Sequence, residues 1–267
     1  MAGDWSSDVC SSDLNKFSKK KMFYRTKLAD PITAKKADHI ITVSQNSKKD
    51  IIKFLNVSSS KISVVYNGVD QKKFKKMDTN EAKRILEERG WPCDYILYAG
   101  TIDHPGKNPI GVVKAFEKLK EKNRYKGKLI LAGMPGAGYE IVENYILKSK
   151  YKDDIILTGF VTDKELIALY SECKVFCFVS LYEGFGIPPL EAMACGAKTI
   201  VSNTSSLPEV VGDVGLTVEP QNIGELEKAI VDYLEDNVKY STESVKEHLN
   251  NYNWKKLSKE FEKVLTD

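Results

Sequence analysis

The stretch KVFCFVSLYEGFGIPPLEAMACGAKTIVS, residues 174–202, decides the fold. KVFCFV (174–179) is a continuous apolar run that predicts a buried strand, and KTIVS (198–202) predicts a second one. Pro188 and Pro189 suit the first turn of a helix, which we expect near 188–195. A buried strand, a helix and another buried strand predict one unit of a parallel sheet whose faces are covered by helices.

The same alternation continues on both sides of this unit. Apolar or β-branched runs predict further strands at 62–66, 95–99, 128–132, 154–158 and 215–218. Amphipathic segments predict helices near 79–89, 108–123, 139–149 and 163–171. We therefore expect an α/β fold with a Rossmann-like parallel sheet. Such sheets bind ligands beyond the carboxyl ends of their strands, so we expect a site in the loops after Ala99, Ala132, Thr158 and Val179.

The two ends of the chain have patterns of their own. HIITV (39–43) predicts a short buried strand, and Ser44 can cap a helix that runs to about Leu55. After Pro220 the pattern is helical and charged to the end, with Trp254 near the start of the last helix.

Residues 15–50 carry a local excess of positive charge, with ten Lys or Arg against three Asp. The part 15–38 has a lysine-rich helical pattern. A basic helix can lie on an anionic membrane surface, and it can also be an ordinary solvated face, which is the simpler interpretation. The first interpretation predicts a cytoplasmic protein with peripheral contact to the inner face of the membrane through 15–50.

The first 14 residues, MAGDWSSDVCSSDL, differ in character from the rest and match no helix or strand period. Residues 4–14 resemble a reading-frame translation of a common sequencing-library adapter. We interpret 1–14 as a disordered, non-native scar, and a natural Ser-rich start is the alternative. The interpretation predicts that natural sequence upstream of Asn15 is missing.

The composition of the 267 residues is that of a globular protein, with 42% hydrophobic and 29% charged residues. It excludes the collagen-like, mucin-like and fully disordered classes. A net charge of +3 argues against a dedicated nucleic-acid binder. Cys10 lies in the 4–14 segment, and the other four cysteines show no metal-site or disulfide spacing, so we expect reduced, mostly buried thiols: Cys93, Cys173, Cys177 and Cys195.

GTIDHPGKN (100–108) follows a predicted strand and precedes a predicted helix, so its amide groups and the helix N-terminus favour an anion. Lys107 adds a positive charge. Five residues separate Gly100 from Gly106 and Asn108 stands where Ser or Thr would, so this is not a Walker A loop. A phosphate role without a magnesium-binding hydroxyl fits better, and a plain strand-to-helix turn with an exposed lysine is the alternative.

GMPGAG (133–138) has the spacing G-x-x-G-x-G and not the dinucleotide fingerprint G-x-G-x-x-G. We expect a flexible turn near a ligand cleft, and a dehydrogenase is disfavoured.

The loop and helix SLYEGFGIPPLEAMACG (180–196) combine features that a nucleotide-sugar needs. Gly184 and Gly186 allow the backbone to approach a ligand closely. The helix N-terminus favours phosphate, while Glu183 in the loop and Glu191 one turn into the helix can accept hydrogen bonds from sugar hydroxyls. As isolated residues, the two glutamates would be read as ordinary surface acids.

The stretch YEGFGIPPLEAMACG contains Glu183 and Glu191 with seven residues between them. It resembles the signature of retaining GT-B glycosyltransferases, especially glycosyltransferase family 4. The resemblance covers about residues 15–267. Four further stretches of the chain are similar to the family: 67–74, 99–116, 159–173 and 202–220. It implies the C-terminal half of a GT-B fold. The implied division is a remnant of an acceptor domain at 15–60, a donor-binding domain at 61–250 and a C-terminal helix at 251–267.

The resemblance also implies roles for single residues. Lys107 would contact the diphosphate and Glu183 would face the donor sugar, and these two are the candidate catalytic groups. Glu191 would bind the ribose hydroxyls. The remaining donor contacts would come from the Val161 backbone at the base, from the amides of Phe185, Gly186 and Ile187, and from Gly100, Thr101 and Asn108.

One departure from the family concerns the second phosphate cation. Many members carry an arginine near the position of Lys107, whereas this chain has Thr101 after Gly100 and Gly106 before Lys107. Donor binding would therefore rest more on amides and the helix dipole. The resemblance implies no metal and no other cofactor.

The implied activity is transfer of a hexose-type sugar, with retention, from a nucleotide-sugar to a glycan, lipid-linked or small acceptor in polysaccharide biosynthesis. The leaving diphosphate would help to deprotonate the acceptor. We expect this chain to bind the donor but to be inactive alone. Two alternatives stay open: a GT-B-fold epimerase or phosphorylase, and a non-catalytic nucleotide-binding module. His39, His104 and His248 are expected to be structural or surface residues.

Overall fold

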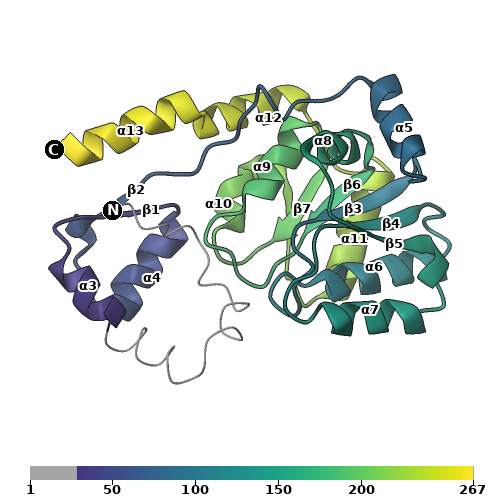
Figure 1. Cartoon of the computed structure of the whole chain (residues 1–267), viewed down its shortest axis with the longest axis horizontal. Coiled ribbons are helices and arrows are strands. Elements are labelled where there is room, and N and C mark those ends of the chain that lie inside the picture. Colours follow the sequence, from purple (N-terminus) through teal and green to yellow (C-terminus); the bar gives the residue numbers. More distant parts are fainter. Residues whose placement is uncertain (1–28, 267) are drawn as a thin grey trace.

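The computed structural model describes residues 29–266, so the 1–14 segment and the part 15–28 of the basic stretch lie outside the described residues. Its main feature is a six-stranded parallel sheet (Figure 1) with the order β5-β4-β3-β6-β7-β8. The six strands are β3 (Tyr95–Ala99), β4 (Lys128–Ala132), β5 (Ile155–Gly159), β6 (Val175–Phe178), β7 (Thr199–Ser202) and β8 (Leu216–Val218). Counted along the chain, this order is 3-2-1-4-5-6, the strand order of doubly wound nucleotide-binding folds. The expected Rossmann-like α/β class is confirmed.

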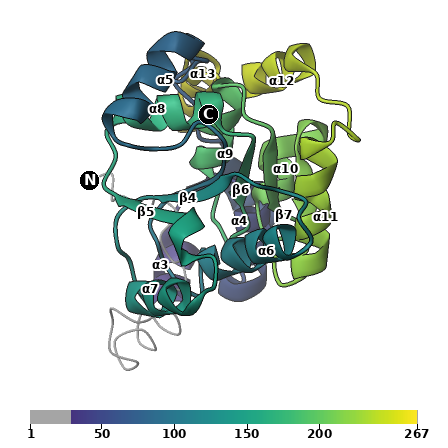
Figure 2. The ribbon, with the colours of Figure 1, turned by 90° about the vertical axis from the view of Figure 1, so that its right-hand side faces the viewer.

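Helices cover both faces of the sheet, as the continuous apolar strands predict. One layer contains α6 (Pro109–Glu121), α7 (Tyr139–Lys148) and α11 (Ile223–Leu234), and the opposite layer contains α5 (Thr79–Glu88), α8 (Asp163–Glu172) and α9 (Ile187–Ala194), as Figure 2 shows. Alternate residues of β3 enter the two cores: Leu97 packs with the second layer, and Ile96 and Tyr98 pack with the first.

The N-terminal unit, residues 29–64, has its own small sheet. β1 (Ile40–Thr42) pairs in parallel with β2 (Ile62–Val64), next to α3 (Asp30–Lys36) and α4 (Gln45–Leu55). Ser44 caps α4 by accepting a hydrogen bond from the Ser47 amide, as predicted. We expected the run 62–66 among the strands of the large sheet, and this was wrong: an apolar run predicts a strand but not the partner that it pairs with.

The other predicted elements begin and end within two residues of their expected positions. The charged C-terminal part forms α12 (Thr242–Leu249) and α13 (Trp254–Thr266), and α13 extends away from the six-stranded lobe in Figure 1. None of the helices in the described range 29–266 is long and apolar enough to cross a bilayer.

Glu209 joins the N-terminal unit to the six-stranded lobe. It lies on α10 (Leu207–Val211), and its carboxylate accepts hydrogen bonds from the amides of Gln45 (2.9 Å) and Asn46 (3.1 Å) in the first turn of α4. It also accepts one from the Tyr66 hydroxyl at 3.2 Å. A carboxylate at a helix N-terminus satisfies amides that have no partner within the helix and interacts favourably with the helix dipole.

We expect the contact of Glu209 with α4 to contribute measurably to the free energy of unfolding. Replacing Glu209 by Ala removes three hydrogen bonds and the charge at the helix N-terminus, so we expect a loss of about 1–2 kcal/mol in the free energy of unfolding. Urea unfolding followed by circular dichroism measures it. The exposed Glu260 on α13 offers the control Glu260→Ala, expected to stay within about 0.5 kcal/mol of the parent. Equal losses in the two variants would contradict the assignment.

Candidate functional site

The site lies where β3 and β6 are neighbours although two strands, β4 and β5, separate them along the chain. The connections from these two strands leave in opposite directions, which opens a crevice at their carboxyl ends. The loop 100–108 leaves β3 and the loop 179–186 leaves β6. The Leu181 amide donates to the Gly106 carbonyl at 2.8 Å and holds the two loops together.

Asn108 fixes the start of α6 and does not have a free side chain for the donor. Its backbone has φ +55°, and its side chain accepts a hydrogen bond from the Gly111 amide at 3.2 Å. The same side chain donates to the carbonyls of Val179 (3.2 Å) and Pro220 (2.7 Å). These bonds tie three segments together, so any role of Asn108 in donor binding acts through the placement of the loops.

The turn 133–138, expected to be flexible, is held against the loop 100–108. Gly136 donates its amide hydrogen to Ile102, His104 donates to Ala137, and Ile102 donates to Met134, at distances between 2.8 and 3.0 Å. Gly133 has φ +147° and lies so close to the neighbouring loop that a Cβ would fall 1.9 Å from the Gly100 carbonyl oxygen. A glycine is required there by both conformation and space.

Lys107 and Glu183 meet at the mouth of the two loops. The ammonium nitrogen of Lys107 lies 3.3 Å from a carboxylate oxygen of Glu183 and 5.8 Å from the centre of the Phe178 ring. Glu183 is 8% exposed. The structure therefore brings the two predicted catalytic groups together, as an ion pair in which the carboxylate already neutralises much of the cation's charge.

The amide groups of residues 184–187 present a further anion-binding feature. No hydrogen-bond acceptor among residues 29–266 is found for the amides of Gly184, Phe185, Gly186 and Ile187. The Phe185 ring is buried and lies 5.9 Å from the Tyr66 ring and 6.0 Å from the Tyr252 ring. Only the backbone of Phe185 can face a ligand, as the resemblance implied.

Gly186 lets the backbone turn into α9. It has φ +110°, a conformation that strains other residues, and a Cβ there would lie 2.5 Å from a methyl group of Leu207. The N-terminus of α9, which follows directly, adds the positive end of a helix dipole to the free amides.

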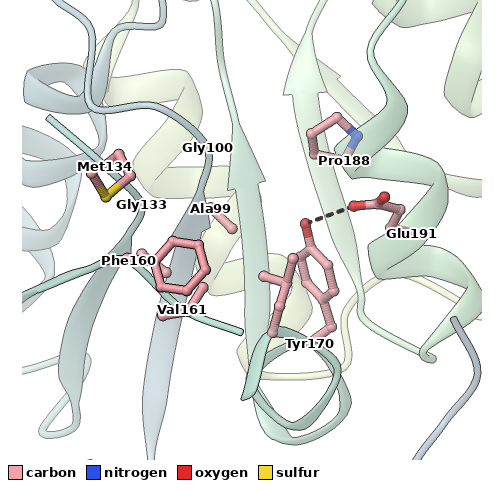
Figure 3. A pocket seen from close by; sticks show the side chains of 11 residues that line it. Ala99, Gly100, Gly133, Met134, Phe160, Val161, Tyr170, Pro188 and Glu191 are labelled. Carbon is pink, nitrogen blue, oxygen red and sulfur yellow. Dashed lines mark hydrogen bonds between the residues drawn. The ribbon is translucent and has the colours of Figure 1, made fainter. Parts of the chain in front are cut away.

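A pocket of about 170 Å³ opens beside this loop (Figure 3). It is smaller than the roughly 300–1,000 Å³ of pockets that hold whole ligands, so it fits one part of a nucleotide. Its lining is mostly apolar, with Glu191 as its charged member: Ala99, Gly100, Ala132, Gly133, Met134, Phe160, Val161, Leu166, Tyr170, Pro188 and Glu191. Three predicted donor-binding residues, Gly100, Val161 and Glu191, thus line one pocket.

Burial raises the pKa of Glu191 from 4.5 to about 7, against the opposing effects of the Lys73 charge and a hydrogen bond from Tyr170. The Tyr170 hydroxyl lies 3.5 Å from the carboxylate, a long hydrogen bond. Asp163 raises the same pKa, and its own carboxylate pairs with Lys73 at 2.7 Å. A carboxylate with this little compensation is ready to accept hydroxyl hydrogen bonds from a ligand.

Thr101 and the three histidines are not among the residues that line this pocket. The Thr101 side chain is exposed, and its carbonyl accepts a hydrogen bond from the buried Tyr98. His39 contacts Ser63, and His248 contacts the Val210 carbonyl. His104 has no hydrogen-bond partner for Nδ1 among the described residues, and burial lowers its pKa. No group of three or more metal-ligating side chains occurs between residues 29 and 266.

Several site residues were not predicted one by one. Met134 and Phe160 flank the pocket with exposed apolar side chains (Figure 3), and Tyr170 reaches Glu191 from α8. Their positions after β4, after β5 and within α8 place them near the carboxyl edge of the sheet. The loops after Ala132 and Thr158, which the sequence singled out, were therefore the available signal.

Two family models match the chain. Residues 92–253, more than half of the chain, match the model of glycosyl transferases group 1. Residues 7–73 match the glycosyltransferase family 4 model. This second match begins within residues 4–14, so the scar interpretation stays a prediction.

The chain is 32% identical to the serotype-specific mannosyltransferase WbdA of Escherichia coli over 82% of its own length and 27% of that protein. It is 34% identical to the O-antigen chain mannosyltransferase B of Escherichia coli over 74% of its length and 51% of that protein. The chain thus spans between about a quarter and a half of these relatives.

The fold is similar to that of HepE of Anabaena, solved in complex with UDP and glucose. The TM-score is 0.79 at 19% sequence identity, over 96% of this chain and 69% of HepE. The parallel sheet, its switch-point site and the matched models together show that the chain belongs to the group 1 glycosyl transferases, with a fold that resembles part of a GT-B glycosyltransferase.

Proposed function

We propose that this chain is the donor-binding part of a retaining glycosyltransferase that transfers a hexose-type sugar from a nucleotide-sugar to a glycan or lipid-linked acceptor. The observation that carries the proposal is the position of Glu191 in an apolar pocket next to free amides at the switch point of the sheet. Because two relatives are named as mannosyltransferases, mannose is the first sugar to test.

In this proposal the base and ribose occupy the pocket, and Glu191 accepts hydrogen bonds from the ribose hydroxyls. The diphosphate lies across the N-terminus of α9, against the amides of residues 184–187. Charge-assisted hydrogen bonds of this kind contribute about 1.5–3 kcal/mol each. The amides would also stabilise the negative charge that develops on the leaving diphosphate during transfer.

The Lys107–Glu183 pair lies where the sugar and the diphosphate would meet. An arriving diphosphate would attract Lys107 and free the Glu183 carboxylate to accept a hydrogen bond from a sugar hydroxyl. The ion pair keeps both partly buried groups from carrying an uncompensated charge.

The first prediction from this proposal concerns binding and transfer by the purified chain. We expect one of UDP, GDP and ADP to bind in calorimetry, because the pocket and amides fit a nucleoside diphosphate. No heat of binding from any of them at millimolar concentration would sink the donor-binding assignment. We also expect no sugar transfer, because the chain spans only a quarter to a half of its relatives; transfer from a nucleotide-sugar by this chain would contradict inactivity.

A second prediction separates ribose recognition from a surface role of Glu191. Glu191→Ala should weaken binding of the nucleotide by about tenfold or more, because the variant loses an acceptor for two hydroxyls. The exposed Glu140 on α7 supplies the control Glu140→Ala, expected to keep the affinity of the parent. Unchanged affinity in Glu191→Ala would indicate that Glu191 is an ordinary surface acid and would contradict its role in ribose binding.

The raised pKa of Glu191 predicts a pH dependence. The carboxylate is protonated below about pH 7, so nucleotide affinity should rise as the pH increases from 6 to 8. Glu191→Gln should lose this rise, while the titration of the ligand phosphate near pH 6 remains in both proteins. Calorimetry at four pH values measures the ratio of the nucleotide affinity of the parent chain to that of Glu191→Gln. If this ratio does not change with pH, Glu191 does not titrate in this range.

The same group sets the sign of a stability change. The pKa of Glu191 is 4.5 in the unfolded chain and about 7 in the folded chain. Between these two pH values the folded chain therefore holds a proton on Glu191 that the unfolded chain has released. The free energy of unfolding should therefore fall as the pH rises through this window, by up to about 3 kcal/mol, and this part of the decrease should be absent in Glu191→Gln.

A further inference from the structure

The segment SNTSS, residues 202–206, lies beneath the loop that carries Glu183, and we call it the hydroxyl segment. Ser202 donates a hydrogen bond to the Ser180 carbonyl at 2.6 Å, and Thr204 donates to the Leu181 carbonyl at 3.1 Å. The Ser206 hydroxyl lies within hydrogen-bond distance of the carbonyls of Glu183 (3.0 Å) and Phe185 (2.7 Å), which share its single hydrogen. Side chains of one segment thus hold four carbonyls of the loop 179–186, which we call the donor loop.

The carbonyl of Gly184, which the hydroxyl segment does not reach, is held from the other side. Ser47 in the first turn of α4 donates to it at 3.2 Å. As a result, the carbonyls of Glu183, Gly184 and Phe185 all have a hydroxyl partner.

These three carbonyls belong to the peptide groups whose amides have no partner among the described residues. In a trans peptide the carbonyl and the following amide point in opposite directions. Because Ser206 holds the carbonyls of Glu183 and Phe185 toward itself, the amides of Gly184 and Gly186 turn away from Ser206, to the side on which the diphosphate is proposed to lie. Ser47 fixes the peptide group between them through the Gly184 carbonyl. Without such bonds, a chain with two glycines could rotate its peptide groups at little cost and present a carbonyl to the phosphate.

Ser205 contributes from an unusual backbone conformation. Its φ is +54°, which a non-glycine residue adopts only where the surroundings require it. In this conformation its hydroxyl accepts the Glu183 amide at 3.0 Å. The strained residue thus fixes the peptide that precedes the predicted catalytic glutamate, which argues for a functional constraint and not only a structural one.

We propose that Ser206, with Ser205 and Ser47, is a positioning residue of the donor site: Ser206 orients two peptide groups so that the amides of Gly184 and Gly186 form a preorganised cradle for the β-phosphate of the donor, and Ser205 and Ser47 fix the neighbouring peptide groups. The proposal rests on the proposed function. It assigns the hydroxyl segment a role in diphosphate binding without any contact between these serines and the ligand.

The experiment compares two probes, a nucleoside diphosphate and the corresponding monophosphate, which share base, ribose and one phosphate. The base is that of whichever of UDP, GDP and ADP binds the purified 267-residue chain. In Ser206→Ala we expect the affinity for the diphosphate to fall by about tenfold while that for the monophosphate changes by less than about twofold. A merely structural role would move both affinities together or neither.

Ser258→Ala is the control. Ser258 is exposed on α13, outside the donor loop, and its hydroxyl donates to the Lys255 carbonyl of the same helix, so the same substitution should leave both affinities unchanged. Should Ser206→Ala fail to fold, as judged by circular dichroism, Ser47→Ala tests the same idea at the half-buried α4 position, with Ser47→Thr retaining the hydroxyl and the parent ratio.

The outcomes separate the two proposals. A parent chain that binds the diphosphate, with an unchanged diphosphate-to-monophosphate ratio in Ser206→Ala and Ser47→Ala, overturns the positioning role alone. A parent chain that binds none of the nucleotides overturns the proposed function and this inference with it. A loss of affinity for the diphosphate but not for the monophosphate in Ser206→Ala, absent in Ser258→Ala, supports both.

Discussion

Parallel pairing of β3 with β6 is the constraint on which the rest of the structure depends. The register Ile96 with Val175 and Leu97 with Phe176 brings two loops together that lie far apart in the sequence. One loop contributes Lys107 and the other contributes Glu183. Because the chain crosses to opposite sides of the sheet after these strands, no helix fills the edge between them, and the space is left for a ligand.

The electrostatics of the site depend more on backbone groups than on side-chain charge. Lys107 is paired with Glu183, and Glu191 is half-buried with a raised pKa. In the proposed function both glutamates would repel a diphosphate if fully charged and unscreened, and the free amides of 184–187 and the N-terminus of α9 would attract it together with Lys107. Backbone amides bind an anion well only if they are held in place, and the serines of the hydroxyl segment supply that restraint in the further inference.

The N-terminal unit is attached to the same loop. Glu209 receives the first amides of α4, and Ser47 of α4 holds the Gly184 carbonyl. Both contacts come from the first turn of one helix, whose start is set by the cap at Ser44. A displacement of α4 would therefore break a stability contact and a loop contact together.

The sequence by itself determined the elements and the chemistry of the donor loop, because apolar runs, helix caps and the spacing of Glu183 and Glu191 are local properties. The tertiary structure alone decided which partner each element meets. It paired 62–64 with 40–42 instead of the large sheet, committed the Asn108 side chain to three loop contacts, and placed Tyr170 and the hydroxyl segment against the predicted residues. The physical reason is that hydrogen-bond partners and strand neighbours are chosen by packing between distant segments, which a local pattern does not encode.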